Sequence, residues 1–380
     1  EMTERKIYNP NRRRMMQNLM GLGLTAASAS SLVSAFATKA LAQNNYKISF
    51  ANITESAELF VMLGDGIEEA AKTAGIELRR YDNNFDGETA LRNAELMVQD
   101  QPDVILEYNG VEGIGLALQR VFDRAGIPFI AINVPVPGGH WFNLVNKDIG
   151  RDTALSMVPI AKQKGWTGDN TTVVIIQSAA SGEEVNDCIR YFYVTAADML
   201  PGMTKVAPSE ITALTTTIGQ SGIQVDGKGL LEPSYTGVKN ILQTLPADRN
   251  ILLYSINDDA TLGAWRAVSE AGRGENTLVG GLGGSVAALQ ELRNNPNWIA
   301  EGSIFFRNWG QYLIAMSVAI LNGVEPPALT KSPQIVLDKS TVDTYYDASG
   351  SPILLPALNE SNEYLASTGI LQLFNNVKGL

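Results

Sequence analysis

The side chains with the strongest catalytic chemistry are scarce in this chain. Its 380 residues include one cysteine, Cys188, and one histidine, His140. A thiol nucleophile needs a base at hydrogen-bonding distance, and the one histidine lies in a Pro-Gly-Gly-His loop. A single histidine also excludes zinc sites built on several histidines and argues against Ser-His-Asp catalysis. We therefore expect a buried, inert Cys188 and no metal site.

Carboxylates are the remaining candidates for catalysis, because the chain has 40 Asp and Glu residues. A suitably spaced pair would hydrolyse a glycoside, so an exported carboxylate-based hydrolase stays open as an alternative. The chain has no Gly-Lys-Ser/Thr loop that would bind phosphates. The segment 21–26 fits a dinucleotide fingerprint by letters, but it follows arginines rather than a strand. We predict that the protein uses no cofactor and is not an enzyme.

The first 42 residues are typical of a secretory signal peptide. Three arginines at 12–14 precede an uncharged stretch at 15–38, and Ala-Leu-Ala at 40–42 forms a small-x-small exit before Gln43. Gly, Ala, Ser and Thr dominate the uncharged stretch, and their low transfer energy disfavours a membrane anchor. The arginines are a loose match to a twin-arginine signal. We predict export to the periplasm, with the folded protein starting near Gln43.

The body of the chain is acidic. The net charge is −11, and residues 1–42 hold six basic and two acidic groups, so the rest carries −15. This charge argues against nucleic acid, which requires a basic surface, and against anionic lipid. One cysteine allows no intrachain disulfide, so the fold must depend on its core, and 45% of the residues are hydrophobic. We expect a monomer that binds neither nucleic acid nor membranes.

From Tyr46 onward, short β-rich runs alternate with amphipathic helical stretches. Strands are predicted at 47–52, 76–81, 103–106, 128–132, 172–176, 250–254 and 277–279. In the second half, helices are predicted near 184–199, 235–245, 261–271 and 286–292. The Gly-rich segment 216–231 lacks periodicity and is predicted to be a loop bordering a cleft. This alternation predicts an α/β protein with two lobes, each a doubly wound parallel sheet whose strand ends bind the ligand.

Three segments carry a family pattern. Residues 61–70 read Val-Met-Leu-Gly-Asp-Gly-Ile-Glu-Glu-Ala, residues 125–130 read Ala-Gly-Ile-Pro-Phe-Ile, and residues 257–264 read Asn-Asp-Asp-Ala-Thr-Leu-Gly-Ala. In order and spacing they resemble the ribose-type periplasmic solute-binding proteins of ABC transporters, from about Tyr46 to about Val342. The resemblance implies the type I periplasmic-binding-protein fold, in which two lobes close on a sugar-like solute and deliver it to a membrane permease. A protein of this fold that signals to a membrane sensor kinase is the alternative.

The resemblance also implies a three-strand hinge. Its strands are expected near 143–148, 304–308 and 334–338. Lobe one would then hold 44–145 plus 308–332, and lobe two 148–304 plus about 333–340. The C-terminal extension 341–380 exceeds what is expected of a short family member. Its segment 359–374 is predicted to form one or two helices on a lobe, with no function assigned.

Sugar binding requires aromatic rings for the apolar C–H faces and amides, carboxylates or arginines for the hydroxyls. By resemblance, the first strand-to-helix loop lines one wall, with Phe60 at the family's stacking position or in the core. Asn257 matches the family's ligand-binding asparagine, and a helix N-cap is its alternative role. The predicted ligand-binding residues are Asn52, Thr54, Glu55, Ser56, Phe60, Tyr108, Asn133, Asn186, Arg190, Asn257, Asp258, Phe306 and Arg307.

Several positions depart from the family pattern. Asn133 replaces an aspartate, Asn186 replaces an arginine with Arg190 one turn further on, and Phe306 replaces the hinge glutamine. These changes remove charged sugar contacts, so the ligand is predicted to be a polyol, a monosaccharide other than ribose or an amino sugar.

Other side chains have expected supporting roles. Glu107 is expected to reach the cleft and, with Glu55, Glu58 and Asp258, to favour a cationic solute. The alternative is that these are solvated charges or charges at a helix N-terminus, which is favoured for Glu58. Arg307 is expected to offer its guanidinium to hydroxyls or a carboxylate. Trp141 and Trp309 join Tyr108 as secondary stacking candidates.

Overall fold

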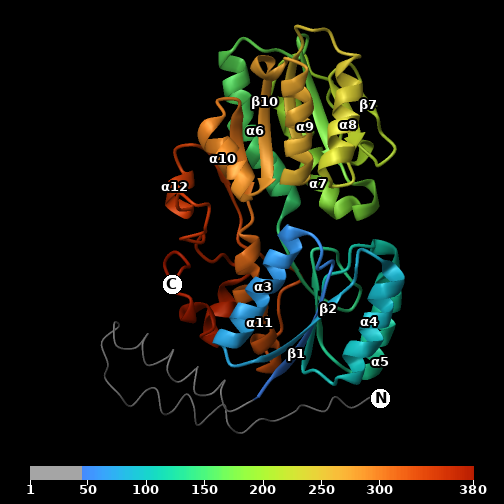
Figure 1. The fold of residues 1–380 in the computed structure, drawn as a ribbon, viewed down its shortest axis with the longest axis vertical. Coiled ribbons are helices and arrows are strands. Elements are labelled where there is room, and N and C mark those ends of the chain that lie inside the picture. The colour runs from blue at the N-terminus through green and yellow to red at the C-terminus, as the bar shows by residue number, and fades with distance from the viewer. Residues whose placement is uncertain (1–44) are drawn as a thin grey trace, which may run out of the picture.

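The computed structural model describes residues 45–380, which form two α/β lobes placed end to end (Figure 1). The predicted architecture of two lobes with parallel sheets is thereby confirmed. The signal peptide predicted over 1–42 lies outside the described residues. Among residues 45–380, no helix combines the length and the apolar character that crossing a membrane requires.

The first lobe is built on a six-stranded parallel sheet in the order β12-β5-β4-β3-β1-β2. Its strands are β1 (Lys47–Asn52), β2 (Glu77–Asp82), β3 (Val104–Glu107), β4 (Phe129–Ile132), β5 (His140–Asn143) and β12 (Thr330–Lys331). Its helices are α3 (Glu58–Thr73), α4 (Gly87–Gln99), α5 (Gly115–Ala125) and α11 (Trp309–Leu321), with the 3-10 turns η1 (Glu112–Ile114) and η5 (Phe306–Asn308). The central strands are buried on both faces, as in parallel sheets covered by helices.

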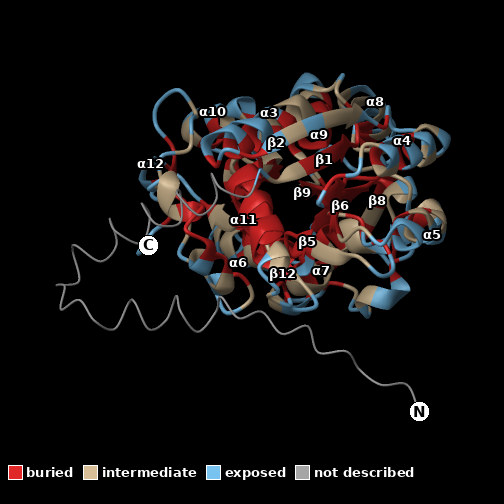
Figure 2. Ribbon diagram, turned by 90° about the horizontal axis from the view of Figure 1, so that it is seen from below, coloured by how far each residue is buried: buried red, intermediate tan, exposed pale blue. Residues whose placement is uncertain are grey.

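Alternation along β1 divides the core of this lobe. Ile48 and Phe50 pack in the core cluster that includes Leu63 of α3, while Ala51 packs with Ala94 of α4. Helix α11 is buried along almost its whole length, as Figure 2 shows.

The second lobe has a seven-stranded sheet in the order β13-β11-β10-β9-β6-β8-β7, in which only the outer strands β7 and β13 pair antiparallel among the described residues. Its strands are β6 (Thr171–Gln177), β7 (Thr217–Ile218), β8 (Gly222–Asp226), β9 (Asn250–Ser255), β10 (Thr277–Gly283), β11 (Trp298–Ser303) and β13 (Ile335–Leu337). Its helices are α6 (Asn146–Gln163), α7 (Glu183–Met199), α8 (Leu231–Leu242), α9 (Asp258–Glu270) and α10 (Val286–Asn294), with the 3-10 turns η2 (Ala179–Ser181), η3 (Pro208–Glu210) and η4 (Gly274–Asn276). Cys188 on α7 is buried, as predicted, and burial raises the pKa of its thiol.

The prediction of a loop at 216–231 is wrong. This segment contains β7 and β8, and β8 pairs in parallel with β6 inside the sheet. Gly222 opens β8 where a Cβ would lie 2.7 Å from the Tyr193 ring, so the glycine marks a close approach rather than a turn. The glycines and polar residues of the segment hide the hydrophobic pattern of a strand.

The chain passes between the lobes three times. Residues 144–145 lead from β5 into α6, residues 304–305 lead from β11 into η5, and residues 332–334 lead from β12 into β13. The third passage lies before most of the predicted hinge strand at 334–338, because β13 already belongs to the second sheet. After β13, the chain forms α12 (Val342–Tyr345), η6 (Glu363–Thr368) and η7 (Leu371–Leu373). The helices predicted near 359–374 are therefore short 3-10 turns, which pack on α11.

Helix α3 packs closely against η5 and α11 at Gly66. A Cβ on Gly66 would lie 1.9 Å from the carbonyl oxygen of Arg307, so backbone or helix must shift to accommodate it. We expect Gly66→Ala to lower the free energy of unfolding by about 1–3 kcal/mol, measured by chemical denaturation. Gly113→Ala is the control, since a Cβ there meets nothing within 4 Å. Equal stability of the two variants would contradict the packing described.

Candidate functional site

The carboxyl ends of the parallel strands in one lobe face those in the other lobe. A Cβ on Gly182, just before α7, would lie 2.3 Å from a carboxylate oxygen of Glu112, which follows β3. The amide of Asn143 donates to Glu184 at 3.4 Å. Burial, the adjacent Asp258 and Glu58 from the opposite lobe together raise the pKa of Asp259. The loops after β1 and β3 therefore lie close to the first turns of α7 and α9, and we expect the ligand-binding cleft between them.

Four aromatic rings pack together on the first lobe, and this cluster, in which Tyr108 and Phe306 are 5% and 4% exposed, is here called the aromatic wall. Phe60 is its centre, with edge-to-face contacts to Phe85, Tyr108 and Phe306 at centroid distances of 5.6, 5.7 and 5.9 Å. Tyr108 and Phe306 also meet edge to face at 6.4 Å. Phe85, which is 50% exposed, was missed in the sequence. The sequence gives little indication of its role, because it sits in a left-handed turn after β2. Only the folded chain brings this turn close to Phe60.

Asn133 places a free acceptor beside this wall. Its side-chain nitrogen donates to the Tyr108 hydroxyl at 3.3 Å, and its backbone oxygen accepts from the Trp141 indole at 2.8 Å. Its side-chain oxygen is buried and has no partner in the described chain. Burial raises the pKa of Tyr108, so its hydroxyl stays protonated. An unfilled acceptor next to aromatic rings suits a ligand hydroxyl.

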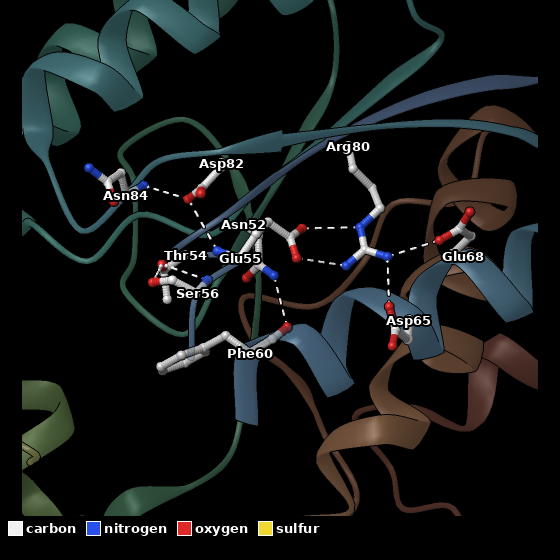
Figure 3. Close-up of polar contacts among 10 residues, drawn as sticks. All are labelled: Asn52, Thr54, Glu55, Ser56, Phe60, Asp65, Glu68, Arg80, Asp82 and Asn84. Atoms are coloured by element: carbon white, nitrogen blue, oxygen red, sulfur yellow. Dashed lines mark hydrogen bonds and ion pairs between the residues drawn. The ribbon is translucent and has the colours of Figure 1, made fainter. Parts of the chain in front are cut away.

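The loop after β1 is held by its own side chains (Figure 3). The Asn52 amide donates to the backbone oxygen of Phe60 at 2.8 Å, and its side-chain oxygen is buried without a partner among residues 45–380. The hydroxyls of Thr54 and Ser56 hydrogen bond at 2.8 Å.

Glu55 turns away from the Phe60 ring toward Arg80 (Figure 3). Arg80 binds both of its oxygens, at 3.0 and 2.7 Å, and also pairs with Asp65 and Glu68. The Glu55 carboxylate is therefore occupied, and Arg80, absent from the predicted set, fixes the outer side of the loop.

Two of the predicted ligand-binding asparagines, both in the second lobe, hydrogen bond to backbone groups. The Asn257 side chain accepts from Ala260 N at 2.9 Å as the N-cap of α9, and it donates to Gly229 O at 2.9 Å. The Asn186 side chain accepts from Ser178 N at 2.9 Å and donates to the carbonyls of Ser178 and Gly182. The alternative cap role of Asn257 is thus observed, and both asparagines fix loops at the cleft edge.

Asp258 faces the interior of the second lobe. One oxygen accepts from Ser285 N at 2.8 Å, the other is buried without a hydrogen-bond partner among the described residues, and the carboxyl group interacts with that of Glu301 on β11. Glu301 is 0% exposed and accepts from Gly284 N at 2.9 Å and from the Trp298 indole at 3.1 Å. Burial first, and the Asp258 charge second, raise the pKa of Glu301 well above its ordinary value. We therefore expect the two carboxyl groups to share a proton in the folded state.

Arg190 is a buried cation with few partners. It is 5% exposed, and its contacts with Glu183 and Asp187 are long, at 3.8 and 3.7 Å. Its Nε is buried, and within residues 45–380 it has no hydrogen-bond acceptor. The Nε donor is therefore left without an acceptor, which a ligand oxygen could supply.

The remaining predicted residues are engaged elsewhere. The half-exposed Arg307 pairs with Glu69 of α3 at 3.0 Å. Trp309 is fully buried behind Phe306, with ring centroids 4.7 Å apart, so it cannot stack on a solute. Glu107 is buried and accepts from Asn83 at 2.9 Å through one oxygen, while its other oxygen has no hydrogen-bond partner among the described residues. Burial raises its pKa to about 8, and its contact with a solute stays a prediction.

No cluster of His, Cys, Asp and Glu in the described part of the chain could hold a metal ion. A cavity of about 190 Å³ lies elsewhere, between the hinge passages and the C-terminal segment, where Val145, Ser332, Gln334 and Pro356 line it. None of the predicted ligand-binding residues contributes to that cavity.

Residues 48–325 match the family described as "Periplasmic binding protein domain". An ABC transporter periplasmic solute-binding protein from Actinobacillus succinogenes with bound D-allose is 20% identical, with a TM-score of 0.64, and 79% of this chain and 100% of that chain are covered. A solute-binding protein from Mycobacterium smegmatis with bound glycerol is 18% identical (TM-score 0.67; 81% and 99% covered). One from Bacillus halodurans with bound myo-inositol is 16% identical (TM-score 0.64; 79% and 97% covered). A search of curated proteins found no match.

Proposed function

Because the chain belongs to the periplasmic binding protein family, we propose that it is the solute-binding component of an ABC importer. It is exported to the periplasm, closes its two lobes on a monosaccharide, polyol or amino sugar, and delivers that solute to a membrane permease. The similar structures hold allose, glycerol and myo-inositol, which all present hydroxyls on a carbon frame.

The observation that carries this proposal is the aromatic wall with the free Asn133 oxygen beside it. The rings suit the apolar C–H face of a sugar, and the amide oxygen accepts from a hydroxyl. From the second lobe, Arg190 supplies donors for other hydroxyls. A solute of this kind would satisfy polar atoms that have no partner within the described part of the chain.

Closure is a shift between open and closed populations, because the solute contacts both walls only in the closed form. Within residues 45–380, the extensively packed pairs of helices and strands each lie inside one lobe. We infer that the lobes rotate about the three passages that join them.

Titration of the purified chain with sugars and polyols tests the proposal. The panel contains allose, ribose, galactose, glycerol, myo-inositol and glucosamine, with leucine as a control of similar size that lacks hydroxyls. We expect one panel member to change the intrinsic fluorescence, because Trp309 contacts Phe306 of the wall, and to make the molecule more compact in small-angle scattering. No response to any sugar or polyol would contradict the proposal, and turnover of a glycoside would favour the hydrolase instead.

A further inference from the structure

The C-terminal segment, residues 342–380, contacts both lobes on the hinge side (Figure 1, red). On the second lobe, Asp343 pairs with Arg293 at 2.9 Å. On the first lobe, the side chains of Asn376 and Gln311 exchange two hydrogen bonds, of 2.9 and 3.2 Å. The segment lies beyond the family match, which ends at residue 325.

Tyr346 is the point where this segment meets the passage from β11 to η5. Its ring stacks on Phe305 with centroids 5.5 Å apart and an interplanar angle of 6°. Its hydroxyl hydrogen bonds to the Ser303 hydroxyl. Both rings are almost completely buried. One side chain therefore holds the last residue of β11 and one residue of the passage.

Phe305 adopts a left-handed backbone conformation, with φ 51° and ψ 47°. Such a conformation is strained for a bulky residue and persists only where the surroundings enforce it. The turn gives two consecutive rings different neighbours. Phe305 packs on Tyr346 and Tyr345, while Phe306 packs on Phe60 and Tyr108.

We propose that Tyr346 is a positioning residue for solute binding. By stacking on Phe305, it holds the passage in the turn that places Phe306 in the aromatic wall, so the C-terminal segment sets solute affinity from outside the cleft. This inference rests on the proposed function. Tyr346 itself does not touch the solute.

Replacing Tyr346 tests the inference. Tyr346→Ala is expected to weaken binding of the panel sugar about tenfold, since the aromatic pair is lost and the turn relaxes. Tyr346→Phe keeps the stack and should restore affinity to within about threefold of the original protein. The matched control is Tyr364→Ala, which removes a tyrosine of the same segment that hydrogen bonds to Thr330 at 2.7 Å, away from the passage. The control should leave affinity unchanged.

A second measurement needs no solute. Hydrogen exchange of amides 304–308 should be faster in Tyr346→Ala than in the original protein and in Tyr364→Ala. Unchanged exchange there would overturn the inference even if no panel member binds, whereas absence of binding by the original protein contradicts only the proposed function. Equal affinity of the original protein and Tyr346→Ala would also overturn it. If Tyr346→Ala does not fold, Tyr346→Leu, which keeps apolar burial without a flat ring, carries the same tests.

Discussion

Replacing Arg190 by Leu is expected to lower solute affinity about 100-fold or more and to leave the free protein at least as stable. Each hydrogen bond from a charged group contributes about 1.5–3 kcal/mol, so two bonds to a solute reach the roughly 2.7 kcal/mol that a 100-fold loss represents. In the free protein the guanidinium is buried with ion pairs no shorter than 3.7 Å. A buried charge with distant partners is costly, and Leu removes that cost.

Calorimetric titration with the panel sugar and thermal unfolding with and without it measure both effects. The matched control is Arg266→Leu, which removes an exposed arginine of α9 that pairs with Glu232 at 3.1 Å. Arg190→Lys should bind with intermediate affinity, because the charge remains and the planar fork is lost. Normal affinity in Arg190→Leu, or a large loss of stability without solute, would show that Arg190 is structural.

The free energy of unfolding is expected to fall as pH rises from 5 to 8. The folded state keeps a proton between Asp258 and Glu301 that the unfolded chain releases above a pKa of about 4.3. Glu107, with its pKa raised to about 8, keeps another. While the folded state binds the extra proton, stability drops by about 1.4 kcal/mol per pH unit for each proton. Carboxylates with lowered pKa, such as Asp86, add stability that is complete above about pH 5, so they do not offset this fall.

Asp258→Asn isolates the buried pair. Its amide can still accept from Ser285 N and can donate to Glu301 in place of the shared proton, so the fall in stability with pH should be smaller. The other titratable groups that face the pair are the hydroxyls of Tyr254 and Tyr346 and the carboxylate of Asp259. Asp259→Asn, on the exposed neighbour, should keep most of the slope. Denaturant unfolding at pH 5, 6, 7 and 8 gives the slopes, and equal slopes for the original protein and Asp258→Asn would disprove the shared proton.

The architecture could be read from the sequence because buried parallel strands give unbroken β-rich runs, such as that of β6. The family resemblance is confirmed by the match over residues 48–325. Strand β8 could not be predicted, because its burial comes from the neighbours β6 and Tyr193 and not from its own hydrophobicity. Lobe boundaries and ligand contacts stay predictions.

The candidate site could be predicted only in part. Phe60, Tyr108, Asn133 and Phe306 were named from sequence, and the structure brings them together. Arg80 and Tyr346 were not, since they act on partners 25 and 43 positions away that only the folded chain brings close. Asn257 and Asn186 were also named from sequence, because an amide side chain suits a hydroxylated ligand. In the structure, both side chains hydrogen bond to nearby backbone groups.

The single buried thiol of Cys188 makes the protein ready for site-specific labelling. Maleimide dyes react with thiolates at the surface, and this thiol is enclosed and has a raised pKa. Cysteines introduced in pairs, one on each lobe, would carry donor and acceptor fluorophores without removal of the native residue. Single-molecule energy transfer between them would then follow opening and closing in individual molecules.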